Sequence, residues 1–173
     1  VVLTAGVAPP FSISLQVGVE EALVLFLVNL AGVLGGLYLM GRFRNGSVAG
    51  MILFLMMVMG VNGLVMTRDL FNVFVFLEIT SIATYAIIGL EQNSRSLSAG
   101  FKYMIAGGLA SALLLIGIIF LYRLTGTLYI DDIINARHLI AGKTGVVALC
   151  LVLVALLIEL KSFPANGWAD PVL

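Results

Sequence analysis

The chain has 173 residues, of which 61% are hydrophobic and 10% are charged, and nine basic side chains balance nine acidic ones. A composition this apolar excludes an ordinary soluble domain and predicts a membrane protein. The balanced charge also excludes the basic face that binds nucleic acid, so we expect no nucleic-acid partner.

The sequence contains no recognisable set of residues for enzyme chemistry. Cys150 is the single cysteine and lies in an apolar run, where it is typical of a small hydrophobic residue. His138 is the single histidine. Because there is no Cys/His cluster, no glycine-rich phosphate loop and no Ser/His/Asp set, we expect no catalytic chemistry, no cofactor and no metal in this chain.

Apolar runs separated by polar connections predict an all-α, polytopic membrane protein that forms a single membrane domain over residues 1–173. A membrane helix needs about 20 apolar residues, and the runs approach that length. Gly32, Gly35 and Gly36 in the first run are typical of close helix packing. The five expected spans are near 22–41, 48–66, 70–90, 99–122 and 144–161.

The third span carries Glu78 near its centre. If the helix begins after Asp69, Glu78 lies about 13 Å deep in a hydrocarbon core about 30 Å thick. A charge at that depth costs from about 3 to more than about 10 kcal/mol, so the carboxyl group has to be protonated, hydrated or paired. We therefore expect a functional role, and the alternative is a neutral glutamic acid that only joins helices.

Hydroxyl groups share the face of this helix that carries Glu78. Ser81 and Tyr85 follow at spacings of three and seven residues, so either could hold the carboxyl group or a water molecule beside it. Asp69 follows the short turn Thr67-Arg68 and is expected to cap the helix.

We expect Ser98 to cap the fourth span, which puts Lys102 in the first helical turn. A cation there opposes the helix dipole, so another interaction should hold it. One alternative is a lysine that extends to the membrane surface. The other is a direct or water-mediated contact with Glu78, which the small residues between Gly107 and Ser111 would allow by bringing the two helices close.

The polar segment between the fourth and fifth spans is expected to lie at the membrane surface, with one short helix near 131–141. His138 could relay protons at a channel mouth, but a solvated surface histidine is the favoured alternative. Basic residues in the short connections favour a cytoplasmic position for the first and third loops.

The fifth span meets Lys161 and then Pro164. Proline removes a backbone donor and clashes with the carbonyl of Leu160, so the helix should break beside Lys161. Broken membrane helices build polar sites in transporters, but a helix that ends at the membrane surface is an equal alternative. Glu159 points about 200° away from Lys161 on the same helix, which makes it an accessory acid at most.

The order and spacing of several short motifs resemble the antiporter-like membrane subunits. That family is shared by respiratory complex I, multisubunit cation/proton antiporters and membrane-bound hydrogenases. The resemblance covers about residues 11–168. Its motifs are Asp69-Leu-Phe-x-x-x-Val-Phe-x-Glu78, Lys102-Tyr, Thr125-Gly-Thr127 and Lys161-x-Phe-Pro164-x-x-x-Trp168.

The resemblance implies roles for individual residues. In that family a glutamate on the fifth helix and a lysine at a broken seventh helix form a proton-transfer pair, and some members add a lysine on the sixth helix. These roles fall on Glu78, Lys161 and Lys102 as a proton relay, with Ser81, Tyr85, His138 and Glu159 as accessory candidates. The spans of this chain then resemble the family's helices three to seven.

The sequence also departs from the family pattern. Asn166 stands where many members have histidine, and Trp168-Ala-Asp170-Pro171 differs from the usual ending of the motif. Two preceding helices and the inverted second repeat do not appear, so we expect either part of a longer subunit or a split subunit completed by a neighbour.

We therefore expect a subunit that provides one half-channel for protons, with sodium as a second candidate ion. It would belong to an ion-translocating oxidoreductase or a cation/proton antiporter complex in a cell inner or plasma membrane. Its partners would be lipid and other membrane subunits, including one that completes the missing half-channel. The alternatives are a structural membrane subunit whose polar residues only join helices, and a self-sufficient small transporter.

Overall fold

The computed structural model describes residues 2–3, 14–44, 48–90 and 94–160. The described part is all-helical apart from two paired strands of two residues each, which confirms the expected all-α class. The fifth span and the break at Pro164 stay predictions. The elements are β1 (Val2–Leu3), β2 (Ser14–Leu15), α1 (Val19–Arg44), α2 (Val48–Met66), α3 (Leu70–Gly89), α4 (Ser94–Thr125), α5 (Ile130–Asn135) and α6 (Lys143–Glu159).

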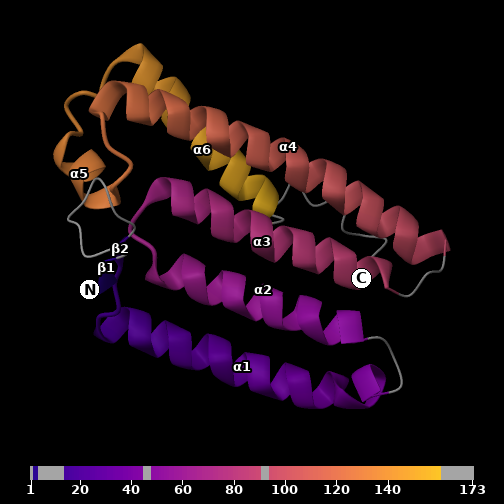
Figure 1. Cartoon of the computed structure of the whole chain (residues 1–173). Coiled ribbons are helices and arrows are strands. Elements are labelled where there is room, and N and C mark those ends of the chain that lie inside the picture. Colours follow the sequence, from indigo (N-terminus) through magenta and orange to yellow (C-terminus); the bar gives the residue numbers. More distant parts are fainter. Residues whose placement is uncertain (1, 4–13, 45–47, 91–93, 161–173) are drawn as a thin grey trace.

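The long helices lie side by side in chain order. Figure 1 shows α1, α2, α3 and α4 as successive neighbours with alternating directions, and α6 against α4. Residue contacts join α1 to α2, α2 to α3, α3 to α4, and α4 to α6. The short helix α5 lies at the end of the bundle where α3 begins and α4 ends.

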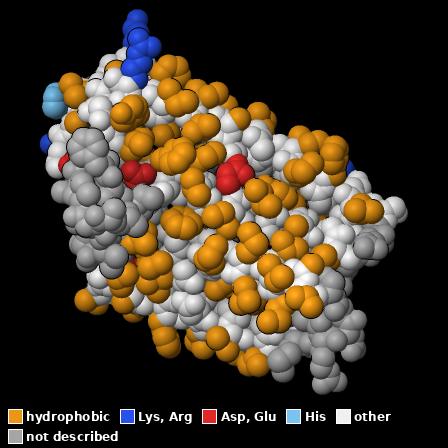
Figure 2. All heavy atoms as spheres, viewed as in Figure 1, with side chains coloured by type: hydrophobic (Ala, Val, Ile, Leu, Met, Phe, Trp, Pro, Cys, Tyr) orange, Lys and Arg blue, Asp and Glu red, His pale blue; other side chains and the backbone are white. Residues whose placement is uncertain are grey.

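Helices α1 to α4 are each long and apolar enough to cross a membrane. Their surfaces fit a lipid environment, because large hydrophobic side chains such as Phe26, Leu55 and Leu109 are more than half exposed. Figure 2 shows hydrophobic side chains over most of the viewed face and basic side chains near its edges. The chain is therefore a multi-pass membrane protein. Helix α6 has 17 residues, and its span stays a prediction.

Helix α4 begins earlier than expected. It starts at Ser94, so Ser98 is inside the helix and Lys102 is nine residues into the helix instead of in the first turn. The sequence pattern shows only where the apolar run begins. The helix extends beyond that point, toward Ser94, because its first turns pack on α3. Ala99 is 2% exposed, and Gly100 lies so close to α3 that a Cβ there would be 3.3 Å from the Tyr85 carbonyl oxygen.

The segment after α4 is attached to the turn between α2 and α3. The Leu70 N–H donates to the Leu128 carbonyl at 2.9 Å, and the Ile130 N–H donates to the Arg68 carbonyl at 2.9 Å. Gly126 has a φ of 71°, which favours glycine in this turn. A short helix is expected near 131–141. The observed helix, α5, is shorter: it ends at Asn135, and turns follow it.

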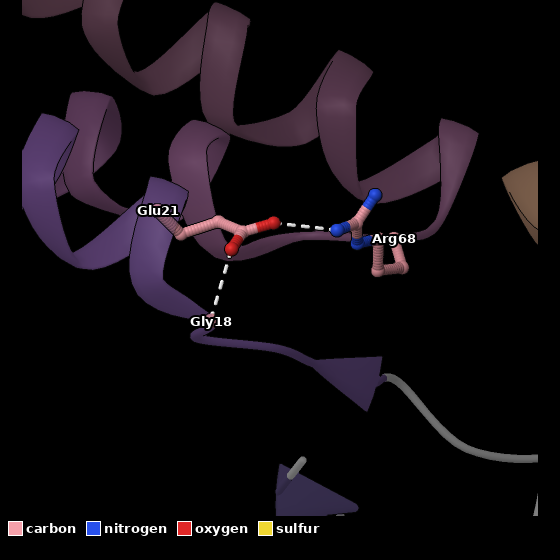
Figure 3. Close-up of polar contacts among 3 residues, drawn as sticks. All are labelled: Gly18, Glu21 and Arg68. Carbon is pink, nitrogen blue, oxygen red and sulfur yellow. Dashed lines mark hydrogen bonds and ion pairs between the residues drawn. The ribbon is translucent and has the colours of Figure 1, made fainter.

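The same turn is attached to the start of α1. Figure 3 shows the Glu21 carboxylate between two donors: the Arg68 guanidinium at 2.5 Å and the Gly18 N–H at 2.9 Å. The Asp69 carboxylate accepts from the Asn72 N–H at 3.0 Å, which confirms Asp69 as the cap of α3. These bonds fix one end of α1, α2 and α3 together.

Glycines let the helices approach closely. The Cβ of a substituted Gly32 would lie 3.4 Å from Val58 of α2, as expected for a packing glycine. At Gly117 of α4 the contact with α6 is tighter: an added Cβ would lie 2.7 Å from Val152 Cγ2 and 3.1 Å from the Ala148 carbonyl oxygen. The α4/α6 contact therefore requires glycine at position 117.

Gly117→Ala is expected to lower the free energy of unfolding by about 1–3 kcal/mol, because the new methyl group overpacks the α4/α6 contact. The control is Gly108→Ala on the same helix, where nothing lies within 4 Å of an added Cβ. There the change should be neutral or stabilising by up to about 1 kcal/mol. Thermal unfolding of the detergent-purified protein measures both, and equal stability of the two variants would contradict the packing.

The two connections that flank α4 should lie on opposite sides of the membrane, because a helix of 32 residues is about 48 Å long. Ser94→Cys and Ala141→Cys, each in a Cys150→Ser background, put one exposed thiol at the start of α4 and one in the segment that follows α4. A membrane-impermeant thiol reagent should label them from opposite sides. Labelling from the same side would refute the crossing by α4.

Candidate functional site

Glu78 lies within the apolar helix α3, eight residues after its start, which is about 12 Å along the axis. The side chain is half-buried, and its Oε1 accepts a hydrogen bond from the Ser111 hydroxyl of α4. Burial in an apolar region makes such a partner necessary, because a carboxyl group that loses water without a replacement is costly. The expected close contact between the third and fourth helices is therefore present, and it contains Glu78.

Ser81 bonds to a second carboxyl group. Its hydroxyl donates to Oε2 of Glu159 at 3.1 Å, across the contact between α3 and α6. Ser81 is 5% exposed, and Glu159 is half-buried as the last residue of α6. The structure thus places a second carboxyl group against the same face of α3, one helical turn from Glu78.

Aromatic hydroxyl groups extend this polar region toward the end of α3. The rings of Tyr85 and Tyr103 pack edge to face with centroids 5.4 Å apart. Tyr85 is half-buried and lies seven residues after Glu78 on the same face of α3. Gly107 of α4 lies beside both Tyr85 and Glu159. A Cβ added to it would be 3.6 Å from the Tyr85 ring and 3.8 Å from Glu159 Oε1.

These residues form what we call the three-helix polar cluster. The spacing of its members explains why they meet, because residues three, four or seven apart share a helix face. Within the described residues, no group of three or more histidine, cysteine, aspartate or glutamate side chains is placed to hold a metal ion. The cluster consists of Glu78, Ser81 and Tyr85 from α3, Tyr103, Gly107 and Ser111 from α4, and Glu159 from α6.

Ser111 is the member whose role the sequence does not reveal. The run of small residues around Ser111 predicts only that α4 can approach a neighbouring helix closely. The signal that could identify it is its spacing of four from Gly107 and eight from Tyr103, which puts a hydroxyl group on the α4 face that meets α3.

Other expected site residues lie elsewhere. Lys102 is exposed on α4, and nine positions at 100° each place it about 180° from Ser111, so the structure does not bring it to Glu78. His138 is exposed in the turns after α5, outside the cluster. Lys161 and Pro164 lie outside the described residues.

Helix α6 ends partway along α3. Glu159, its last residue, contacts Ser81, which lies 11 residues or about 17 Å from the start of α3. In Figure 1 the yellow end of α6 lies beside the middle of α3. The described helix therefore stops beside the polar cluster.

Comparisons with known proteins agree on one family. The family model described as NADH:quinone oxidoreductase/Mrp antiporter, TM, matches residues 67–172. An NADH-quinone oxidoreductase subunit of Desulforudis audaxviator is 36% identical over 95% of this chain and 34% of its own length. A Na(+)/H(+) antiporter subunit of Bacillus subtilis is 34% identical over 92% of this chain and 33% of its own length.

A solved structure has the same fold. A chain of the membrane-bound sulfane sulfur reductase, an archaeal respiratory membrane complex, superposes with a TM-score of 0.76 at 31% identity. The match covers 98% of this chain and 35% of that one. This chain therefore spans about a third of the length of the relatives it matches.

Proposed function

The chain belongs to the NADH:quinone oxidoreductase/Mrp antiporter membrane family, and we propose that it provides one half-channel for protons in a larger membrane complex. The complex would be a respiratory, ion-translocating oxidoreductase or a cation/proton antiporter, in a cell inner or plasma membrane. The name of the Bacillus subtilis relative supports sodium as a coupled ion. Other membrane subunits would surround the chain and complete the path.

The position of Glu78 carries this proposal. The helix around it is apolar enough to cross a membrane, yet the carboxyl group is held by a hydroxyl group from α4 about 12 Å from the helix start. Ionisable groups at such depth are expensive, and proteins keep them mainly for ion pathways. A carboxyl group can take up and release a proton there without any cofactor.

We propose Lys161 as the partner of Glu78 in a proton relay. Burial favours the neutral form of each group, whereas proximity favours the ion pair. A change that separates the two groups would therefore move a proton from the lysine to the glutamate, and their approach would reverse the transfer. The end of α6 beside the cluster supports this arrangement, because Lys161 follows Glu159 by two residues in the sequence.

The proposal includes a break of the fifth membrane span near Pro164. Freed backbone groups at membrane depth need protein or water as partners, and a polar cluster offers both. Helix α6 stops beside Ser81 while α3 continues for eight further residues. That difference in depth supports a break within the membrane over a helix that ends at its surface.

Lys102 has a separate place in the proposal. Because it is exposed on the α4 face away from Ser111, a relay role for it requires contact with another subunit. The same exposure is compatible with a lysine that extends to the membrane surface.

A structural subunit is the second candidate function. The bonds from Ser111 to Glu78 and from Ser81 to Glu159 each join two helices, as polar residues do when they only stabilise helix packing. Asn29 of α1 and Asn62 of α2 make such a reciprocal bond, with N to O distances of 2.8 and 3.2 Å. Variants that keep the packing but remove the proton distinguish the two functions.

Glu78→Gln should abolish ion translocation while the complex still assembles. The amide keeps an oxygen that accepts from Ser111, but it cannot exchange a proton. Proton uptake by vesicles that contain the full complex measures the effect, and Glu20→Gln at the exposed start of α1 is the control. Normal pumping by an assembled Glu78→Gln complex would leave only the structural function.

Lys161→Ala should also stop translocation, because the relay then lacks its second proton carrier. Lys143→Ala is the matched control: it removes an exposed lysine from the first position of α6. The same vesicle assay compares them. Wild-type rates in both variants would place Lys161 at the membrane surface and contradict the relay.

A further inference from the structure

We propose that Glu159 is a second proton-carrying carboxyl group of the path, and that it receives the proton from Glu78 by way of the Ser81 hydroxyl. This inference rests on the proposed function and adds one step to it. On sequence alone Glu159 has at most an accessory role, because it points away from Lys161 on its own helix. The contacts of Glu159 with α3 and α4 change that assessment.

The first observation is the hydrogen bond across α3 and α6. Ser81 is 5% exposed and donates to Glu159 Oε2 at 3.1 Å, within the range of a normal hydrogen bond. A hydroxyl group can accept a proton while it donates its own, so it transmits a proton without any net change. Ser81 also lies about one helical turn from Glu78, so its hydroxyl group is on the side of α3 that carries Glu78.

The second observation is the surroundings of Glu159. The side chain is half-buried although it is the last residue of its helix, and its Oε1 faces the clearance that Gly107 leaves. Glu78 and the partner of Glu159, Ser81, lie about one helical turn apart on the same face of α3. Two ionised acids near one another in an apolar region repel, which favours a single proton shared along this face.

The third observation is the position of the two carboxyl groups relative to the helices around them. Glu78 is held from the α4 side by Ser111, and Glu159 stands at the end of α6 from which the chain continues to Lys161. Glu159 is therefore the carboxyl group of the cluster that is nearest in sequence to Lys161, and the proposal puts it between Glu78 and that lysine in the path.

The step is balanced in protons and involves no electron transfer. The O–H bond of protonated Glu78 breaks, and its proton passes to the Ser81 oxygen directly or through one water. The original Ser81 O–H bond breaks as its proton forms a new O–H bond on Glu159 Oε2. Glu78 ends as a carboxylate, Ser81 ends as it began, and Glu159 ends as a carboxylic acid.

The experiment measures proton uptake, and its pH profile, in vesicles that contain the full complex. Glu159→Gln should reduce the rate about tenfold or more, as for loss of a positioned acid or base. Glu159→Asp keeps a proton-carrying group and should recover part of the rate with an altered pH profile. Ser81→Ala should reduce the rate by a smaller factor and also alter the profile, and Glu20→Gln should match the wild type.

The outcomes separate this inference from the proposed function. Loss in Glu78→Gln together with a wild-type rate in Glu159→Gln overturns the role of Glu159 and leaves the proposed function intact. A wild-type rate in Glu78→Gln overturns the proposed function itself. If Glu159→Gln fails to assemble, the pH profiles of Glu159→Asp and Ser81→Ala decide, and profiles identical to the wild type overturn the inference.

Discussion

A carboxyl group halfway along an apolar helix has to find its hydrogen-bond partners inside the protein, and the packing of α3, α4 and α6 follows from that constraint. Glu78 takes its partner from α4, and Ser81 on the next turn of α3 bonds to α6. Helices separated by full-sized side chains could not bring these short hydroxyl groups into reach. The tight contact at Gly117 is therefore part of the same arrangement as the polar bonds.

Hydrophobic packing alone would not select this arrangement. In a lipid environment apolar side chains gain little by leaving lipid for protein, so small residues and polar bonds decide which helices associate. The α4/α6 contact shows the part played by small residues: Ala155 is fully buried beside Leu114 and Ile118, and Gly117 permits the approach. The apolar outer faces are free to contact lipid or other subunits.

Much of the fold could be predicted from the sequence, because membrane helices are long apolar runs with recognisable ends. The cap at Asp69 and the packing role of Gly32 are expected and present. The start of α4 is expected too late, since polarity marks the edge of the apolar run while packing on α3 extends the helix to Ser94. The pairing of Ser81 with Glu159 could not be predicted because helix periodicity describes one helix and does not say which neighbour meets it.

The bonds at one end of the bundle have a mechanical consequence. The Glu21–Arg68 ion pair, the Asp69 cap and the backbone bonds from Leu70 to Leu128 join α1, α2, α3 and the segment after α4 at a single end. Because the helices are bonded together at that end, we expect a helix that moves relative to its neighbours to tilt about it, so that displacement grows with distance along the axis. A tilt of about 5° moves a residue about 12 Å from that end by about 1 Å. A displacement of that size is enough to break a hydrogen bond such as the one from Ser111 to Glu78, so a small rotation at this end can separate Glu78 from α4 without any change in helical structure.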